Sequence, residues 1–305
     1  MRALVATGIA DRPLELKDVD EPTTTADQAI VAVEAMSINR GELRLVASRP
    51  AGWRPGQDIA GTILRSATTD DALPVGTRVV ALVDQAGWSE RVAAPASRIA
   101  ALPDGVSFAA AAALPVAGLT ALRALRLGGM LLGRRVLITG ASGGVGHLAV
   151  QLAARQGAHV TAVSRQANLP SRGAESVRVV QQTAEAEGQF DLVLESVGGE
   201  SLTASLRLVA RDGIVVLFGN STNQESSVSF GSFAGRAHAR LCAFFVYESG
   251  EPPSFGSDLG LLSAEIAAGR LEPQVGLEAS WREALDGLEA LRARRVQGKV
   301  VLHVN

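Results

Sequence analysis

The sequence predicts an α/β protein that combines a small β-rich domain with a doubly wound parallel sheet. The first hundred residues alternate short apolar runs with turns built from Gly, Pro and Asp. From Arg135 onward, apolar runs alternate with helical stretches, which is typical of a parallel sheet covered on both faces. A glycine-rich turn joins the first of these runs to the helix behind it. The 305 residues suffice for about two domains.

The β-rich part begins at the N-terminus. Its apolar runs predict six strands, at Ala3–Ala6, Leu14–Val19, Ala29–Ala35, Ile59–Leu64, Val79–Val83 and Arg91–Ala94. Short strands separated by such turns are typical of a small barrel or sandwich. Beyond Phe108 the composition becomes helical, and we expect that stretch to be broken at Pro115 and at Gly118.

The second part follows a strand–helix rhythm. It predicts strands over 134–140, 158–165, 190–196 and 213–219, and helices over 143–157 and 199–212. The last fifty residues predict helices over Asp258–Ala268 and Trp281–Ala293, and strands over 274–279 and 299–304. We therefore expect domains at 1–116 and 117–251, with residues 252–305 returning to complete the first domain.

Charge and cysteine content exclude several classes of protein. The formal net charge is −2 and no basic stripe is present, which argues against a nucleic-acid binder. Cys242 is the only cysteine, so the chain forms neither an internal disulfide nor a thiolate metal cluster. The charged N-terminus is unlike a signal peptide, and no apolar run approaches the ~18–20 residues that cross a bilayer. We expect a cytoplasmic protein with no membrane partner.

The glycine-rich turn carries the strongest functional signal. Glycines at such a turn let the chain reverse tightly, let the backbone approach a pyrophosphate and allow close packing of helix on strand. The phosphate then lies at the amino end of the helix, where free N–H groups and the helix dipole favour negative charge. This interpretation assigns dinucleotide contacts to Gly140, Ser142, Gly143, Gly144, Val145 and Gly146. The alternative is a turn with a structural role only.

The end of the next strand distinguishes the two nicotinamide dinucleotides. Proteins that bind NAD usually place an Asp or Glu there to accept a hydrogen bond from the ribose 2′-hydroxyl. This chain has Ser164 and Arg165 instead, a hydroxyl and a guanidinium that suit a 2′-phosphate. We therefore predict NADPH as the cofactor, with Arg172 as a second, weaker candidate. The alternative is that Arg165 is an ordinary solvated arginine, one of 27 in the chain.

Several stretches together resemble a known family. They are SINRGELR, RPGQDIAG, VGTRVVALV, the long segment from GWSERVAAP to LPVAGLTAL, VLITGASGGVGHLAVQLA, LVLESVGG, GIVVLFGN and VQGKVVLHV. In this order they resemble the zinc-independent, quinone oxidoreductase-like and enoyl reductase-like branch of the medium-chain dehydrogenase/reductases. The resemblance implies a GroES-like β-rich domain, a Rossmann cofactor domain, and a homodimer.

The resemblance also bears on metal binding. Zinc-dependent relatives have Cys where this chain has Asn39, and Gly-His-Glu where it has Gly56, Gln57 and Asp58. An amide is a poor zinc ligand compared with thiolate or imidazole. The four histidines are scattered without metal-like spacing. We therefore expect no catalytic zinc, and we expect Asp58 to be structural, pairing with an arginine.

Zinc-free relatives reduce quinones or the double bond of enones and enoyl thioesters. The resemblance places Asn39 and Gln57 in the substrate cleft as amide donors to a carbonyl oxygen, and Thr120 on a helix beside the nicotinamide. These three are the predicted catalytic residues. The further predicted cofactor contacts, after the fourth and fifth strands of the Rossmann domain, are Ser196, Val197, Gly198, Phe218, Gly219 and Asn220. The alternatives are that Asn39 caps a turn and that Phe218 packs in a core.

The predicted function is hydride transfer from NADPH to a quinone or to the C=C bond of an α,β-unsaturated carbonyl. Tyr247, the single tyrosine, lies outside the first domain, so the proton comes from solvent or the acceptor is a quinone. The loop 225–240 is a candidate for substrate specificity, and the strand-like residues 241–247 for a homodimer contact. Two alternatives stay open: an NADPH-binding sensing protein without turnover, and a non-redox polyketide-tailoring cyclase or isomerase on the same scaffold.

Overall fold

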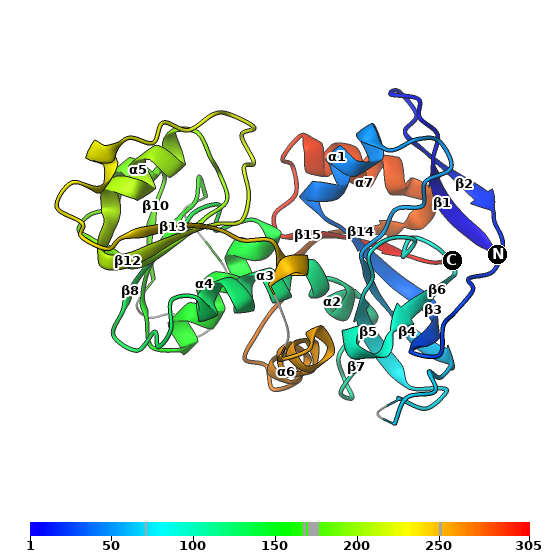
Figure 1. Cartoon of the computed structure of the whole chain (residues 1–305). Coiled ribbons are helices and arrows are strands. Elements are labelled where there is room, and N and C mark those ends of the chain that lie inside the picture. Colours follow the sequence, from blue (N-terminus) through cyan, green and yellow to red (C-terminus); the bar gives the residue numbers. More distant parts are fainter. Residues whose placement is uncertain (71, 167–168, 170–176, 250–251) are drawn as a thin grey trace. The chain divides into compact units, whose positions relative to one another are not determined.

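The computed structural model describes residues 1–70, 72–166, 169, 177–249 and 252–305. The chain divides into two compact units, shown in Figure 1. The first unit comprises Met1–Leu119 with Glu251–Asn305, and the second comprises Thr120–Gly250. No helix in the described part of the chain is long and apolar enough to cross a membrane.

The first unit is built on a seven-stranded, largely antiparallel sheet. Its strand order is β14 (Val275–Ser280), β15 (Lys299–His303), β3 (Gln28–Ile38), β4 (Asp58–Arg65), β5 (Arg78–Leu82) and β7 (Ile99–Ala101), with β6 (Arg91–Pro95) also paired to β3. A separate hairpin joins β1 (Arg2–Ala6) to β2 (Leu14–Asp18). All six strands predicted for this part are present. The sheet holds a core that includes the fully buried Trp88 and Trp281.

The C-terminal segment contributes to this sheet, because β15 pairs antiparallel with β3. The register sets Val300 opposite Ile38, so that the start of β15 lies beside the end of β3. On the other side of β3, Asp58 at the start of β4 is paired with Ser37. Residues about 240 positions apart in the sequence therefore meet at the same end of three adjacent strands.

The helices of the first unit differ from the prediction in two places. They are α1 (Arg40–Ser48), α2 (Phe108–Ala112), α3 (Pro115–Arg126, which continues into the second unit), α6 (Phe255–Ala267) and α7 (Ala284–Arg292), with 3-10 turns η1 (Ala96–Arg98) and η5 (Trp281–Glu283). The prediction missed α1. It was also wrong about a break at Gly118, which lies inside α3, where an added Cβ would approach Leu262 Cδ1 of α6 to 2.9 Å. Pro115 does mark a boundary, because it is the first residue of α3, a position where its missing N–H costs nothing.

The second unit is a doubly wound parallel sheet, as predicted. Its strand order is β10 (Val177–Val180), β9 (His159–Val163), β8 (Arg135–Ile138), β11 (Phe190–Glu195), β12 (Val209–Leu217) and β13 (Arg240–Ala243). The chain order reverses between β8 and β11, and ligands of such sheets bind where the carboxyl ends of the strands flank this switch point. Figure 1 shows α4 (Gly144–Arg155) and α5 (Glu200–Leu208) on opposite sides of the sheet.

The last strand of this sheet is shorter than we predicted from the sequence. The apolar residues 241–247 were expected to form one strand, but β13 ends at Ala243. A 3-10 turn, η4 (Val246–Glu248), follows and contains Tyr247. Two further 3-10 turns of this unit are η2 (Thr183–Glu185) and η3 (Phe230–Phe233). Strand β13 is nevertheless the last strand of the sheet, with Leu241 exposed along it and Phe245 exposed just beyond it.

Candidate functional site

The glycine turn between β8 and α4 is packed too tightly for side chains at two of its positions. Gly140 has φ +60°, a conformation that favours glycine. An added Cβ on Gly146 would lie 2.3 Å from the carbonyl oxygen of Gly140 and 2.7 Å from Cα of Ala141. The turn is therefore folded directly against the first turn of the helix, so that α4 begins at the edge of the sheet.

The amino end of α4 is open and electropositive. Gly143 is the N-cap residue, is exposed and has no side chain to satisfy the first N–H groups of the helix. The N–H groups of Gly144, Val145 and Gly146 have no acceptor among the described residues. The nearby His147 is buried, with Nδ1 3.0 Å from the carbonyl oxygen of Gly143. Free N–H groups at the start of a twelve-residue helix fit a pyrophosphate.

Ser164 and Arg165 lie directly after β9, beside this turn in the sheet. Ser164 is buried, and its Oγ accepts a hydrogen bond from the N–H of Gln166 at 3.0 Å. The Arg165 side chain is exposed and makes no ion pair or hydrogen bond with any residue that the structure describes. An uncommitted guanidinium suits an anion such as a 2′-phosphate. The second candidate, Arg172, lies outside the described residues.

The loop after β11 is tied to the turns on both sides of it. The N–H of Ser196 donates to Thr139 Oγ1 at 2.9 Å, which links the loop to the end of β8. The carbonyl oxygen of Ser196 accepts from Ser221 N–H at 3.0 Å, and that of Val197 accepts from Thr222 N–H at 3.0 Å. The predicted cofactor residues in the described part of the chain therefore share one edge of one sheet.

Glu195 organises this loop, and the sequence analysis did not single it out. The carboxylate is fully buried; Oε1 accepts from the N–H groups of Val197 and Gly198 at 2.7 and 2.9 Å. Oε2 accepts from the hydroxyls of Ser201 and Ser205 at 3.1 and 2.9 Å. An acidic residue that ends an otherwise apolar strand was the available signal, because a buried charge requires such partners.

The loop after β12 holds the remaining predicted contacts. Phe218 is half-buried, and its N–H donates to the carbonyl oxygen of Glu195 at 3.0 Å. Asn220 is exposed, and its amide bonds within its own loop, donating to the Gln224 carbonyl oxygen at 3.0 Å and accepting from Thr222 Oγ1 at 3.1 Å. Gly219 lies between them, where an added Cβ would come 3.2 Å from the Ser196 carbonyl oxygen. Close packing at this glycine keeps the two loops together.

In the first unit, Asn39 belongs to a buried polar cluster at the ends of β3, β4 and β15. Its Nδ2 donates to Asp58 Oδ2 at 2.8 Å. Its Oδ1 accepts from Lys299 Nζ at 2.5 Å, and Lys299 also donates to Asp58 Oδ2 at 3.0 Å. Asn39 is also the N-cap residue of α1. The alternative role of a cap therefore applies to its backbone position. Its side chain is engaged within the cluster.

The partner of Asp58 is a lysine, and the expectation of an arginine was wrong. Asp58 is fully buried and Lys299 is 3% exposed. The physical reason is space: an ammonium is a compact charge with three donors, whereas a guanidinium is a broad planar fork. No local pattern in the sequence indicates this pair, because only the pairing of β15 with β3 brings Lys299 to the cluster.

Glu42 is the fourth member of this cluster and is fully buried. Its Oε2 accepts from the N–H of Asn39 at 2.8 Å, and its Oε1 has no hydrogen-bond partner among the described residues. Burial, and then the neighbouring charge of Asp58, raise the pKa of Glu42 to about 8. A carboxyl with this pKa is mostly protonated at pH 7, and the ion pair of the cluster joins Lys299 to Asp58.

Gln57 and Thr120 are the other two predicted catalytic residues. Gln57 directly precedes Asp58; its side chain is half-buried, and its amide makes no hydrogen bond with the residues that the structure describes. The Gln57 amide therefore differs from the Asn39 amide, which is engaged with Asp58 and Lys299. Thr120 is buried on α3 at the start of the second unit.

The residues at Asn39 and Gln57 do not fit a zinc ion. The oxygen of Asn39 is occupied by the Lys299 ammonium, and a second cation there would be repelled. Across the part of the chain that the structure describes, no group of three or more His, Cys, Asp or Glu side chains has a metal-holding arrangement. The donor groups at these two positions are therefore unsuited to zinc.

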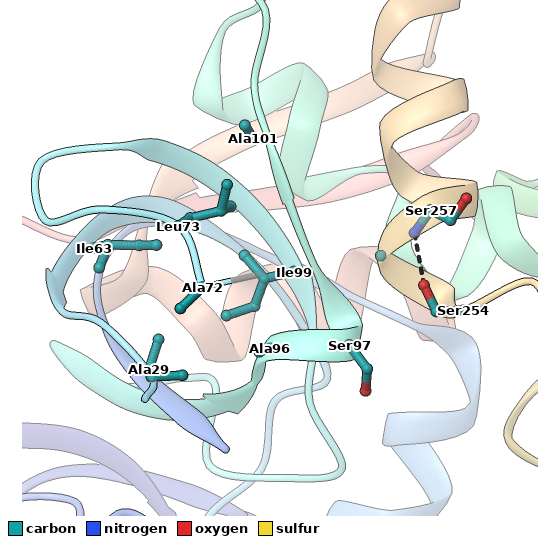
Figure 2. A pocket seen from close by; sticks show the side chains of 12 residues that line it. Ala29, Ile63, Ala72, Leu73, Ala96, Ser97, Ile99, Ala101, Ser254 and Ser257 are labelled. Carbon is teal, nitrogen blue, oxygen red and sulfur yellow. Dashed lines mark hydrogen bonds between the residues drawn. The ribbon is translucent and has the colours of Figure 1, made fainter. Parts of the chain in front are cut away.

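A cavity of about 250 Å³ lies elsewhere in the first unit (Figure 2). It is bordered by β3, β4, β7 and the start of α6, where Ser254 Oγ accepts from the N–H of Ser257 at 3.1 Å. Its lining includes the small or apolar side chains of Ala29, Ile63 and Ile99. None of the predicted site residues and no titratable side chain is among its described lining residues.

Comparison with known proteins identifies the family. A family model described as a zinc-binding dehydrogenase matches residues 169–302. Over 288 residues the chain is 34% identical to the spectinabilin polyketide synthase system protein NorB of Streptomyces orinoci, covering 90% of this chain and 13% of that protein. Over 187 residues it is 35% identical to the chloroplastic quinone-oxidoreductase homolog of Spinacia oleracea, covering 55% of this chain and 57% of that one. The chain thus spans less than two thirds of the length of either relative.

Among solved structures, the chain is similar over its whole length to the quinone oxidoreductase from Thermus thermophilus. The TM-score is 0.83, the identity is 30%, and both chains are covered completely. The chain therefore belongs to the medium-chain dehydrogenase/reductase superfamily. Within it, the chain falls in the branch that resembles quinone oxidoreductases and enoyl reductases, as the sequence analysis predicted.

Proposed function

We propose that this protein is an NADPH-dependent oxidoreductase that transfers hydride to a quinone or to the C=C bond of an α,β-unsaturated carbonyl. The observation that carries the proposal is the open amino end of α4 together with the uncommitted guanidinium of Arg165 at the end of the neighbouring strand. A relative of known structure supports it: the Thermus enzyme, 30% identical, is described as a quinone oxidoreductase in complex with NADPH.

In this proposal the second unit binds the cofactor. The N–H groups at the start of α4 hold the pyrophosphate, and Ser164 and Arg165 hold the 2′-phosphate. The loop residues Ser196–Gly198 and Phe218–Asn220, held together by backbone hydrogen bonds, contact the ribose and the nicotinamide. When bound, NADPH supplies the hydride.

The first unit supplies the polar groups for the acceptor. Hydride addition to a conjugated acceptor places negative charge on its oxygen, which an N–H donor stabilises. Gln57 is the principal donor in this proposal, because its amide is free of described partners. Asn39, whose amide is already bonded to Asp58 and Lys299, presents a fixed second amide. Thr120 keeps its proposed place beside the nicotinamide.

A fluorescence titration with NADPH and with NADH tests the cofactor assignment. We expect the wild-type protein to bind NADPH about ten-fold tighter or more, and Arg165→Ala to lose this preference, a difference of about 1.4 kcal/mol. Arg134→Ala is the matched control, because Arg134 is also exposed but precedes β8 and so lies at the opposite edge of the same sheet. If neither nucleotide binds, the oxidoreductase proposal is wrong.

The acceptor class is tested by NADPH oxidation with a panel of quinones, enones and short enoyl thioesters. The thioesters belong in the panel because the chain matches a polyketide synthase protein over 90% of its own length. We expect reduction of at least one class, with a product reduced by two electrons. Tight NADPH binding without any turnover would favour the sensing protein, and a product of unchanged oxidation state would favour the isomerase.

A further inference from the structure

Asp58 joins three separate segments of the first unit. Its Oδ2 accepts from Ser37 Oγ at 2.8 Å, from Asn39 Nδ2 at 2.8 Å and from Lys299 Nζ at 3.0 Å. Its Oδ1 accepts from the N–H of Val116, near the amino end of α3, at 2.8 Å. One fully buried carboxylate therefore receives four donors, from β3 and the residue after it, from β15 and from α3.

The charges around Asn39 also decide how its amide is turned. An amide that presented its NH₂ group to the Lys299 ammonium would set two donors against each other. The carboxylate of Asp58 likewise accepts hydrogen bonds and makes none when ionised. The orientation with Oδ1 on Lys299 and Nδ2 on Asp58 is therefore the one that both charges favour. The Asn39 side chain is fixed before any ligand arrives.

Position 299 carries a lysine in a chain whose basic residues are almost all arginines. The chain has 29 basic residues, of which only Lys17 and Lys299 are lysines. Lys17 is an exposed surface residue, with 62% of its side chain accessible. Lys299 is 3% exposed, and its ammonium lies within hydrogen-bond distance of both Asn39 and Asp58. A compact ammonium fits between these two acceptors, whereas the larger guanidinium fork requires more room.

We propose that Asp58 and Lys299 form a buried positioning pair that holds the Asn39 amide and the strand end carrying Gln57 in the orientation used for the substrate carbonyl. The link to Gln57 is covalent, because Gln57 directly precedes the anchored Asp58. The pair acts through Asn39 and Gln57 and touches no reacting atom. The catalytic part of this inference rests on the proposed function, and the positioning part does not.

The test uses variants of the full chain. Removing Lys299 alone would leave a buried, unpaired carboxylate, which is strongly destabilising. The double variant Asp58→Asn with Lys299→Met therefore removes both charges together, and Lys299→Arg keeps the charge but changes its shape. Lys17→Met is the matched control for losing a lysine. Circular dichroism selects the variants that are folded at the assay temperature.

Two readouts separate positioning from bulk stability. The first is steady-state kinetics with the best acceptor, alongside the NADPH dissociation constant. We expect kcat/KM for the acceptor to fall about ten- to hundred-fold in the double variant and in Lys299→Arg. The dissociation constant for NADPH should stay within about two-fold, because the predicted cofactor contacts lie in the second unit. The second readout is the set of NMR side-chain amide signals of Asn39 and Gln57. The variants Asn39→Asp and Gln57→Glu assign these signals. We expect the signals to shift in the double variant and in Lys299→Arg.

The outcomes decide the two claims separately. A folded double variant or a folded Lys299→Arg with unchanged amide signals overturns the positioning role. Shifted amide signals with kcat/KM within about two-fold of wild type overturn its relevance to the reaction. If the wild-type protein reduces no acceptor, the proposed function fails, and the amide signals still decide whether the pair positions these side chains.

Discussion

Glu42 illustrates at the scale of one residue how burial sets a charge state. In the unfolded chain its carboxyl titrates near the ordinary value of 4.5, and in the folded protein burial raises its pKa to about 8. Between these two values the folded protein holds one more proton than the unfolded chain, so a rise in pH favours unfolding. The contribution of protonated Glu42 to the unfolding free energy is fully present below about pH 4.5. It is lost as the pH rises through about 8.

We therefore predict a pH-dependent stability difference between the wild-type protein and Glu42→Gln. The glutamine side chain resembles the neutral carboxyl in shape and does not titrate. Between about pH 5 and pH 8, the unfolding free energy of the wild type should fall relative to that of the variant by about 1.4 kcal/mol per pH unit. Urea unfolding at several pH values measures this difference. Parallel profiles for the two proteins would show that Glu42 is ionised throughout.

At the scale of one element, the turn into α4 contains glycines with two different roles. A Cβ on Gly146 would collide with backbone atoms of Gly140 and Ala141, which have little room to move. Gly143 is exposed at the helix start, and an added Cβ would approach only the Gly140 carbonyl oxygen, at 3.2 Å. Gly146 is thus needed for packing, whereas Gly143 lacks a side chain that would cover the first N–H groups of the helix.

The two glycines should therefore respond differently to substitution by alanine. We expect Gly146→Ala to lower the unfolding free energy by about 1–3 kcal/mol, the usual cost of overpacking. Gly143→Ala should leave stability within about 0.5 kcal/mol and weaken NADPH binding, because the added methyl group would stand at the helix start that binds the phosphate in the proposed function. Thermal unfolding and the NADPH titration on both variants measure this. Equal losses of stability would contradict the assignment.

At the scale of the whole molecule, we predict a homodimer formed through the segment 241–247. Among the strands that the structure describes, β13 is the last of its sheet, and Leu241 and Phe245 are 37% and 65% exposed. An uncovered edge strand with apolar residues tends to pair with another chain. Light scattering at micromolar concentration should give twice the 31.6 kDa mass of the chain.

The variant pair Leu241→Lys and Phe245→Lys tests this contact. Two buried positive charges would disfavour a two-fold interface, so the double variant should be a monomer. Met130→Lys is the control, because Met130 is 80% exposed on the same unit and lies outside the segment 241–247. A wild-type protein of monomer mass, or a double variant of dimer mass, would count against the prediction.

The amino-acid sequence is sufficient to predict the class of fold, the family and the place of the glycine turn. These depend on local patterns: alternation of apolar runs, strand–turn–helix order, and residue types such as Ser164 and Arg165 at a strand end. The break wrongly expected at Gly118 and the missed helix α1 show the limit of local patterns. Gly118 lies inside α3, where its missing side chain leaves room for Leu262. Asn39 is the N-cap residue of α1, which follows the buried strand β3.

The tertiary structure decided which side chains are engaged and which are free. Register alone brings Lys299 to Asn39 and Asp58, because β15 pairs with β3 across about 260 intervening residues. Burial, and then the neighbouring charge of Asp58, raise the pKa of Glu42. The four donors to Glu195 lie within ten residues of it, in its own loop and in α5, and the fold of that loop turns them toward the carboxylate. The pKa of Glu42 and the partners of Lys299, in contrast, depend on distances between segments far apart in the chain. The order of residues does not give these distances, because the pairing of the strands sets them.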